Sequence, residues 1–222
     1  MRCRRIFHAA VLTAMCCGLT RSAEATTINI NFDELPPANL AYASGQYAGL
    51  GVTMQSLALS PAVDAVGETF AAAMVFDGFA VLSGDPAVSA PNFGATTNVF
   101  LQPSGLLFSF STPVSFLSLQ TDDAGGEAVD IVRLMALRSL GGGMFEVIAV
   151  TFGSDAETTA PGNILSLSLP NGFSYAMFAT ATEPEGFDNL TFTQTPEPAT
   201  LALLGTGLLV LARRRSRSKS RV

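Results

Sequence analysis

The stretch that indicates the fold most clearly is Val129–Leu140 (VDIVRLMALRSL), followed by Gly141-Gly142-Gly143 and then Met144–Phe152 (MFEVIAVTF). Both flanks are short runs rich in apolar and β-branched residues, which are typical of strands. Glycine supplies the positive φ angles that a tight turn between two strands needs. The stretch therefore predicts a β-hairpin.

The rest of residues 26–195 repeats this pattern of short runs ending at Gly, Pro, Asn or Asp. We expect further strands at Thr27–Phe32, Gly51–Leu59, Asn98–Gln102, Leu106–Ser111, Val114–Gln120, Ile164–Leu169, Phe173–Thr180 and Leu190–Thr193. Pro113 should end the strand before it, because proline cannot donate to a ladder. Residues 60–97 predict loops, with a short strand at Met74–Phe76 or Phe79–Leu82. About nine or ten strands in one segment of this length predict a single all-β domain, a sandwich or a barrel.

Charge is sorted along the chain. Residues 26–195 contain sixteen acidic residues and only two basic ones, Arg133 and Arg138, whereas the other ten basic residues lie at the two ends. Lys and Arg beside a membrane span stay on the cytoplasmic side, so this sorting predicts a chain threaded through a membrane. It excludes a nucleic-acid binder built on a basic domain.

Residues 1–25 have the features of a secretory signal peptide. Arg2, Arg4 and Arg5 form a positive region, an apolar run follows at Ala9–Leu19, and Ala23-Glu24-Ala25 predicts cleavage after Ala25, with Ala23 and Ala25 as the small residues that the peptidase needs. An amphipathic first helix is the alternative. All three cysteines lie in this segment, so the processed chain would contain no disulfide.

Residues 196–222 form the second terminal signal. Pro196-Glu197-Pro198 precedes an apolar run of 14 residues, 199–212, and a basic tail, 213–222. A helix of that length spans about 21 Å, less than the roughly 30 Å hydrocarbon core. It can still insert if the bilayer thins and the arginines snorkel. The expected element is a short C-terminal transmembrane helix.

Residues 196–215 closely resemble the PEP-CTERM sorting signal of bacterial exported proteins. The resemblance implies that Pro196, Glu197 and Pro198 are recognised by a membrane protease-transpeptidase, the exosortase, which removes the helix and basic tail. It further implies delivery to the cell surface or the extracellular matrix after transient anchoring in the membrane.

The two ends of the segment 26–195 share a short pattern, Phe32-Asp33-Glu34-Leu35 at the start and Phe187-Asp188-Asn189-Leu190 at the end. The segments Asn31–Leu35, Gln46–Thr53 and Gly186–Phe192 resemble the ectodomains often joined to this sorting tail, which look like jelly-roll sandwiches akin to carbohydrate-binding modules. The resemblance implies a jelly-roll-like β-sandwich in which the first and last strands are neighbours.

Most catalytic chemistry is excluded by composition. The only histidine is His8, and residues 26–195 contain no His, Cys, Trp or Lys. Ser-His-Asp and Cys-His catalysis and His- or Cys-ligated zinc are therefore ruled out. A pair of carboxylates could still hydrolyse glycosides, but the aromatic platforms usual in sugar sites are reduced to Tyr42, Tyr47 and Tyr175. We expect no enzyme.

Calcium is the cofactor that the remaining groups could hold, because oxygen ligands suffice for it. One candidate site combines Asp33, Glu34 and Asp188 at the terminal edge, and another combines Asp122, Asp123 and Glu127 in the loop Thr121–Glu127. The alternative for both is a set of solvated acids that keep the protein soluble.

Three functions stay open on the sequence alone. The leading one is an exported surface or matrix protein with a non-catalytic structural or adhesive role. The second is a calcium-assisted module that binds extracellular polysaccharide, and the third is a surface hydrolase that uses carboxylates.

Overall fold

The computed structural model describes residues 25–32, 38–58, 63–76, 78–83, 92–95, 104–122, 130–155, 163–180, 186–195 and Gly207. Thr27–Thr195 form one compact unit, called the body below. Its described elements are strands, apart from the short 3-10 helix η1 (Ala48–Leu50). The all-β prediction is confirmed.

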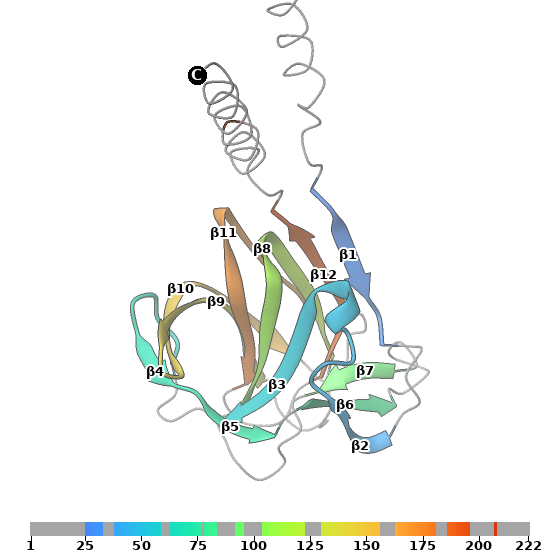
Figure 1. Ribbon diagram of the computed structural model, residues 1–222. Coiled ribbons are helices and arrows are strands. Elements are labelled where there is room, and N and C mark those ends of the chain that lie inside the picture. The colour runs from blue at the N-terminus through green and yellow to red at the C-terminus, as the bar shows by residue number, and fades with distance from the viewer. Residues whose placement is uncertain are drawn as a thin grey trace, which may run out of the picture. The chain divides into compact units, whose positions relative to one another are not determined.

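The described strands are β1 (Thr27–Ile30), β2 (Ala38–Ala43), β3 (Val52–Ala58), β4 (Thr69–Ala71), β5 (Ala73–Phe76), β6 (Gly78–Ser83), β7 (Asn92–Ala95), β8 (Ser104–Asp122), β9 (Asp130–Gly141), β10 (Met144–Asp155), β11 (Ile164–Thr180) and β12 (Gly186–Gln194). They pair in the order β2-β6-β7-β12-β8-β11-β9-β10-β4, with β1 paired to β12 and β3 paired to both β5 and β8 (Figure 1). Every one of these pairings is antiparallel.

Two long strands, β8 and β11, fold this sheet over on itself. The first half of β8 pairs with the second half of β11, and the second half of β8 pairs with the first half of β11. Phe187 of β12 packs against Phe108 of β8 and Phe178 of β11, each with ring centroids 5.5 Å apart. The two halves of the sheet therefore face each other across a shared core.

The expected strand end at Pro113 is wrong, because β8 continues through it. Pro113 lies where the sheet folds over, with no residue registered opposite it, so its missing N–H interrupts no ladder. Its carbonyl accepts the Thr195 N–H at 2.7 Å. In the same way Ile164–Leu169 and Phe173–Thr180 are one strand, and Gly172 takes the bend with φ 71°.

The central hairpin is confirmed. β9 and β10 pair across Gly141, Gly142 and Gly143, whose φ angles are 85°, 62° and 78°.

Residues 60–97 contain more strands than expected. Both short strands considered there are present as β5 and β6, and β4 and β7 add two more. The strand expected at Asn98–Gln102 lies outside the described residues.

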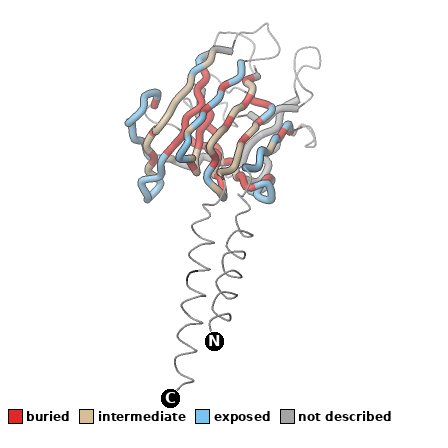
Figure 2. Tube along the Cα trace, turned by 90° about the horizontal axis from the view of Figure 1, so that it is seen from above, coloured by how far each residue is buried: buried red, intermediate tan, exposed pale blue. Residues whose placement is uncertain are grey.

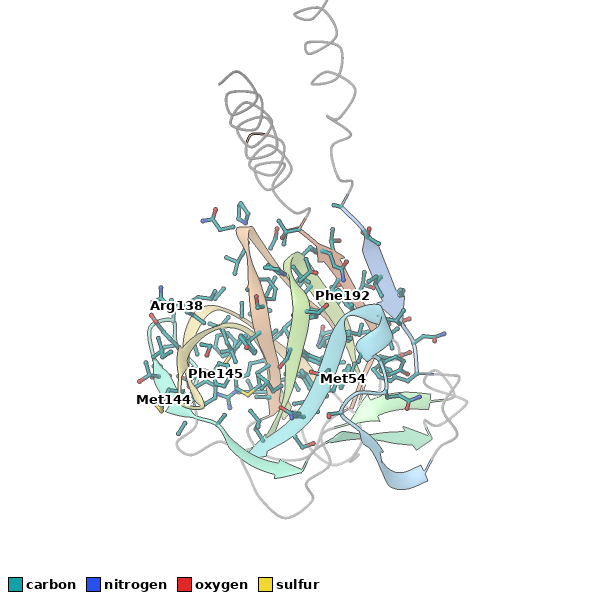
Figure 3. All side chains as sticks on the ribbon, viewed as in Figure 1. Met54, Arg138, Met144, Phe145 and Phe192 are labelled. Atoms are coloured by element: carbon teal, nitrogen blue, oxygen red, sulfur yellow. The ribbon has the colours of Figure 1, made fainter. Side chains whose placement is uncertain are left out.

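Two apolar clusters lie on opposite faces of the β8–β11–β9 part of the sheet, because alternate residues of each strand enter different clusters. The inner cluster lies between the two halves of the sheet, and its largest fully buried members include Phe32, Met54, Phe108, Phe178, Phe187 and Phe192. Figure 2 shows buried stretches, in red, running along the strands of the body. The outer cluster consists of Leu57, Val63, Phe70, Leu107, Met135, Leu137, Phe145, Val147, Met177 and Ala179. Figure 3 labels Met54 and Phe192 in the first and Phe145 in the second.

In the part of the chain that the structure describes, no helix has the length and apolar character needed to cross a membrane. The apolar run 199–212 lies outside the described residues except for Gly207.

Candidate functional site

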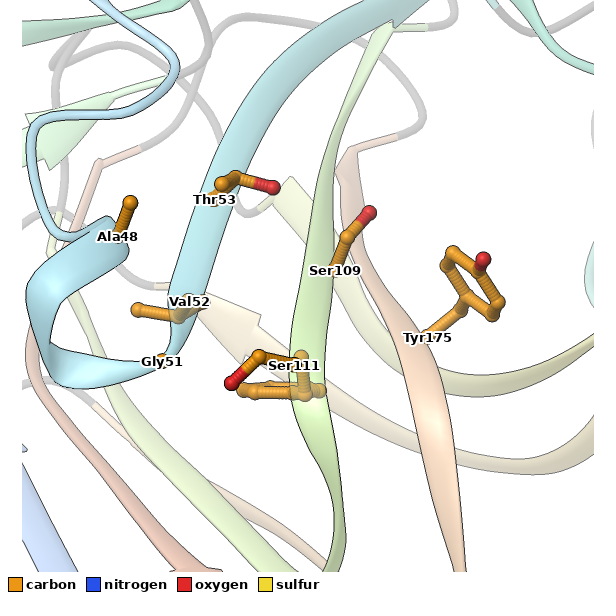
Figure 4. A pocket seen from close by; sticks show the side chains of 8 residues that line it. Ala48, Gly51, Val52, Thr53, Ser109, Ser111 and Tyr175 are labelled. Atoms are coloured by element: carbon orange, nitrogen blue, oxygen red, sulfur yellow. The ribbon is translucent and has the colours of Figure 1, made fainter.

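The outer face of β3, β8, β11 and β9 is covered along only part of its length. The cross-strand row Gln55, Leu107, Met177 and Met135 lies among or beside the outer cluster. The next row toward the fold-over is polar, with Thr53 opposite Ser109 and Ser109 opposite Tyr175. Three hydroxyl groups from three adjacent strands are thus brought into one line (Figure 4).

This row borders a shallow hollow of about 220 Å³, called the hydroxyl groove below. It is lined by Ala48, Gly51, Val52, Thr53, Ser109, Phe110, Ser111 and Tyr175 (Figure 4). The lining contains no charged side chain. Apolar walls with a few placed polar groups are the usual make-up of a ligand site.

The walls of the groove are held in place by their neighbours. The Tyr175 ring packs edge-on against Phe145, with centroids 5.2 Å apart. The loop after η1 is fixed to β8 because the Ser111 N–H donates to the Gly51 carbonyl at 2.9 Å. Gly51 has φ 87°, a conformation that other residues rarely adopt, so glycine is favoured at this position.

This groove was not predicted from the sequence. Tyr42, Tyr47 and Tyr175 were the three possible aromatic platforms for a sugar, but the structure buries Tyr47 against Phe32, with ring centroids 5.6 Å apart. The side chain of Tyr42 lies outside the described residues. The period-two alternation of each strand does place Thr53 and Ser109 on the face of the sheet away from the inner cluster. Their alignment with each other depends on the pairing register, which is set by contacts distant in sequence.

At the terminal edge, the expected neighbours are observed. β1 pairs with β12, with Ile30 opposite Leu190, and the rings of Phe32 and Phe187 lie 5.3 Å apart. Phe32 and Asn189 both have positive φ, 57° and 51°, which is uncommon for residues other than glycine. The first residues of the two patterns, Phe32 and Phe187, therefore meet.

Asp188 is the one residue of the first calcium set that the structure describes in full. It is 4% exposed, and its Oδ2 accepts a hydrogen bond from Asn189 Nδ2 at 3.2 Å. Asp33 and Glu34 lie outside the described residues. The terminal edge therefore contains one nearly buried carboxylate, that of Asp188.

The second calcium set is described only at its start. Asp122 is the last residue of β8 and lies opposite Gly186, whereas Asp123 and Glu127 fall outside the described residues. Among the residues that are described, no group of three or more His, Cys, Asp or Glu side chains could hold a metal ion. Calcium at either set stays a prediction.

Both basic residues of the body are engaged within it. Arg133 is 4% exposed and its Nη1 donates to the Val63 carbonyl at 2.9 Å. Arg138 pairs with Glu146 across the hairpin. Neither cation lines the groove, and the acidic residues of the body greatly outnumber these two.

One acidic side chain of the body is held by backbone donors. Glu68 Oε2 accepts hydrogen bonds from the N–H groups of Asp64 and Ala65, which hold the pKa of the Glu68 carboxyl below its usual range.

The segment after the body decides the comparison with known proteins. β12 ends at Gln194, and a family model described as the PEP-CTERM protein-sorting motif matches residues 194–217. This chain carries the PEP-CTERM protein-sorting motif. Within the matched PEP-CTERM residues stand Pro196, Glu197 and Pro198, which lie outside the described residues, as does Ala23. Ala25 is described and exposed. The recognition and cleavage roles of these five residues stay predictions.

No curated protein matches the sequence. Solved structures similar to the body of this PEP-CTERM chain include the K2 cleaved adhesin domain of Lys-gingipain, with 13% identity and TM-score 0.45, covering 77% of this chain and 99% of that one. The K1 domain from Porphyromonas gingivalis has 10% identity and TM-score 0.42, with the same coverage. The CBM22-1–GH10 modules of Clostridium thermocellum endo-1,4-beta-D-xylanase 10B have 13% identity and TM-score 0.39, covering 79% and 28%. TM-scores this low do not establish a shared fold.

Proposed function

We propose that this chain is an exported surface or extracellular-matrix protein with a non-catalytic structural or adhesive role. Its body would be a jelly-roll-like β-sandwich, delivered by the sorting signal that follows it. The observation that carries the proposal is the PEP-CTERM motif at residues 194–217, which starts at the last residue of β12.

The same proposal includes the route of export. Residues 1–25 would be a signal peptide removed after Ala25, and 199–212 would be a short helix that anchors the chain in the membrane for a time. An exosortase-type enzyme would then recognise Pro196, Glu197 and Pro198 and remove the helix and basic tail. The basic residues on both sides of an acidic body support this route.

The absence of an enzymatic role is part of the proposal and is supported by the chemistry of the body. Residues 26–195 contain no His, Cys or Lys, which are the usual bases and nucleophiles. The hydroxyl groove contains no carboxylate, so it lacks the pair of acids that glycoside hydrolysis requires.

The intact mass of the protein from its host, after separation of membrane and medium, tests the proposal. We expect a product that begins at Thr26 and ends near Pro196–Pro198. A mass that still includes Ala199–Val222, found only in membranes, would make the tail a plain anchor and would contradict sorting.

The second candidate function is a calcium-assisted module that binds extracellular polysaccharide. It is favoured by the nearly buried Asp188 carboxylate. Asp188 follows Phe187, whose ring contacts Phe32, and Asp33 and Glu34 follow Phe32 directly in the sequence. Oxygen ligands from these three acids would suit calcium.

Calcium binding predicts that millimolar calcium raises the melting temperature of the protein. Because calcium accepts more ligands and looser geometry than magnesium, an equal amount of magnesium should have a smaller effect. Asp188→Asn should abolish the calcium effect. No shift, or an equal shift with magnesium, would contradict calcium at this edge.

A further inference from the structure

We infer that the hydroxyl groove binds a neutral saccharide, with Tyr175 as its aromatic wall and Thr53 and Ser109 as its hydrogen-bonding row. The inference deepens the adhesive role proposed above. It rests on that role only in that the saccharide would be encountered at the cell surface or in the extracellular matrix. It is independent of calcium, because no acidic side chain lines the groove.

The hydroxyl row fits a ligand that both donates and accepts hydrogen bonds. Each Ser, Thr or Tyr hydroxyl can do either. The structure gives the Thr53, Ser109 and Tyr175 hydroxyls no hydrogen-bond partner among the residues it describes, so their capacity is available. Neighbouring strands lie about 4.8 Å apart, so the three residues of the row lie side by side across the face, with the Tyr175 hydroxyl carried farther from the backbone by its ring. A sugar ring likewise carries several hydroxyls, which could pair with them.

The apolar part of the groove fits the other surface of a sugar, which is made of C–H groups. That part is the Tyr175 ring and the exposed Ala48, because the other apolar lining residues, Val52 and Phe110, are buried and their side chains belong to the inner cluster. The Tyr175 ring is held by Phe145 in the outer cluster, so the aromatic wall is formed before a ligand arrives. A wall that is already ordered lowers the entropic cost of binding.

The absence of charge in the lining selects a neutral ligand. An anionic polysaccharide would find no cation there, and it would approach a body in which sixteen acidic residues outnumber two basic ones. Those two cations are committed elsewhere, Arg133 to the Val63 carbonyl and Arg138 to Glu146. Like-charge repulsion would therefore slow and weaken the association of an acidic chain.

The dimensions of the groove indicate a weak site for a short stretch of a long chain. Its volume of about 220 Å³ lies below the roughly 300–1,000 Å³ of typical small-molecule pockets. Such a site would hold one or two rings of a polymer. Many copies at a surface or in a matrix would add avidity to a weak individual contact.

Affinity electrophoresis of the full-length chain in a detergent without a sugar headgroup tests the inference. The probes are five neutral polysaccharides (dextran, mannan, β-glucan, xylan and galactan) and two acidic ones (alginate and polygalacturonate). The variants are Thr53→Val, Ser109→Ala and Tyr175→Phe, each of which removes one hydroxyl and keeps most of the side-chain volume. Matched controls are Thr151→Val and Ser166→Ala, at residues outside the groove.

We expect retardation by at least one neutral polysaccharide and none by the acidic ones. Each groove variant should weaken binding about 3- to 10-fold, the usual loss for one hydrogen bond, and the controls should leave it unchanged. The same result should be obtained in the presence of a calcium chelator. Circular dichroism and melting temperature would show that each variant is folded.

Several results would overturn the inference. They are the absence of binding to all five neutral polysaccharides, binding to the acidic polysaccharides only, and binding that the groove variants and the controls change equally. Binding that is lost with the chelator yet resists the groove variants would also overturn it, while supporting the calcium-assisted function. The outcome of sorting in the host is measured separately, so the two failures are distinguishable.

Discussion

The two apolar clusters of the body differ in how they are closed. The inner cluster lies between two halves of one sheet and receives alternate residues from strands of both halves. The outer cluster lies on the other face and includes residues from β4, β10 and Val63. It also borders Arg133, a nearly buried cation on the same face. The inner cluster depends on the whole fold, whereas the outer cluster depends on a local cover.

The largest expected effect comes from opening the inner cluster. Phe187 is 0% exposed and its ring contacts Phe32, Phe108 and Phe178. Phe187→Ala should lower the free energy of unfolding by about 3–5 kcal/mol, measured by urea denaturation. Phe145→Ala makes the same truncation in the outer cluster and should cost less, because a local cover can collapse into the space. Equal losses would contradict the proposed difference between the clusters.

A middle-sized effect is expected at the buried cation of the outer face. Arg133→Met keeps much of the volume but leaves the Val63 carbonyl without its donor, so the free energy of unfolding should fall by about 1.5–3 kcal/mol. Arg138→Met is the control, because Arg138 is 61% exposed in its ion pair with Glu146 and should contribute less than about 1 kcal/mol. The comparison uses urea denaturation of both variants. A loss for Arg133→Met no larger than that for Arg138→Met would contradict the expected importance of the Arg133 contact.

The smallest effect is expected at the exposed end of the outer cover. The pKa of the Glu68 carboxyl is lowered by the N–H groups of Asp64 and Ala65. The stabilisation is therefore fully present above the unfolded-state pKa, about 4.3, and is lost as pH falls through the lowered folded-state value. Glu68→Gln should reduce the melting temperature slightly at neutral pH, and the reduction should shrink as pH falls through the lowered folded-state pKa of the Glu68 carboxyl.

Asp64→Asn is the control for Glu68→Gln, because it removes one charge from the same loop without touching the two hydrogen bonds. A reduction of the melting temperature by Glu68→Gln that does not change with pH would rule out the carboxylate as its source.

Local patterns were sufficient to predict part of this molecule. The β9–β10 hairpin follows from two apolar runs and three glycines, and the pairing of β1 with β12 agrees with the repeated pattern around Phe32 and Phe187. The course of β8 through Pro113 could not be predicted, because it depends on where the sheet folds over. The hydroxyl groove depends on the registers that align Thr53, Ser109 and Tyr175, and registers are set by contacts distant in sequence.

The pairing of β1 with β12 also bears on the topology of the chain. Thr27 lies opposite Thr193, and their hydroxyl oxygens are 3.0 Å apart. The first and last strands of the body thus start and finish one strand spacing from each other, about 4.8 Å. The body is therefore suited to circular permutation. A short linker could join the two ends here, and new termini could be placed elsewhere, for example at Gly142 in the hairpin turn. The places where the body begins and ends are therefore not a requirement of the sheet.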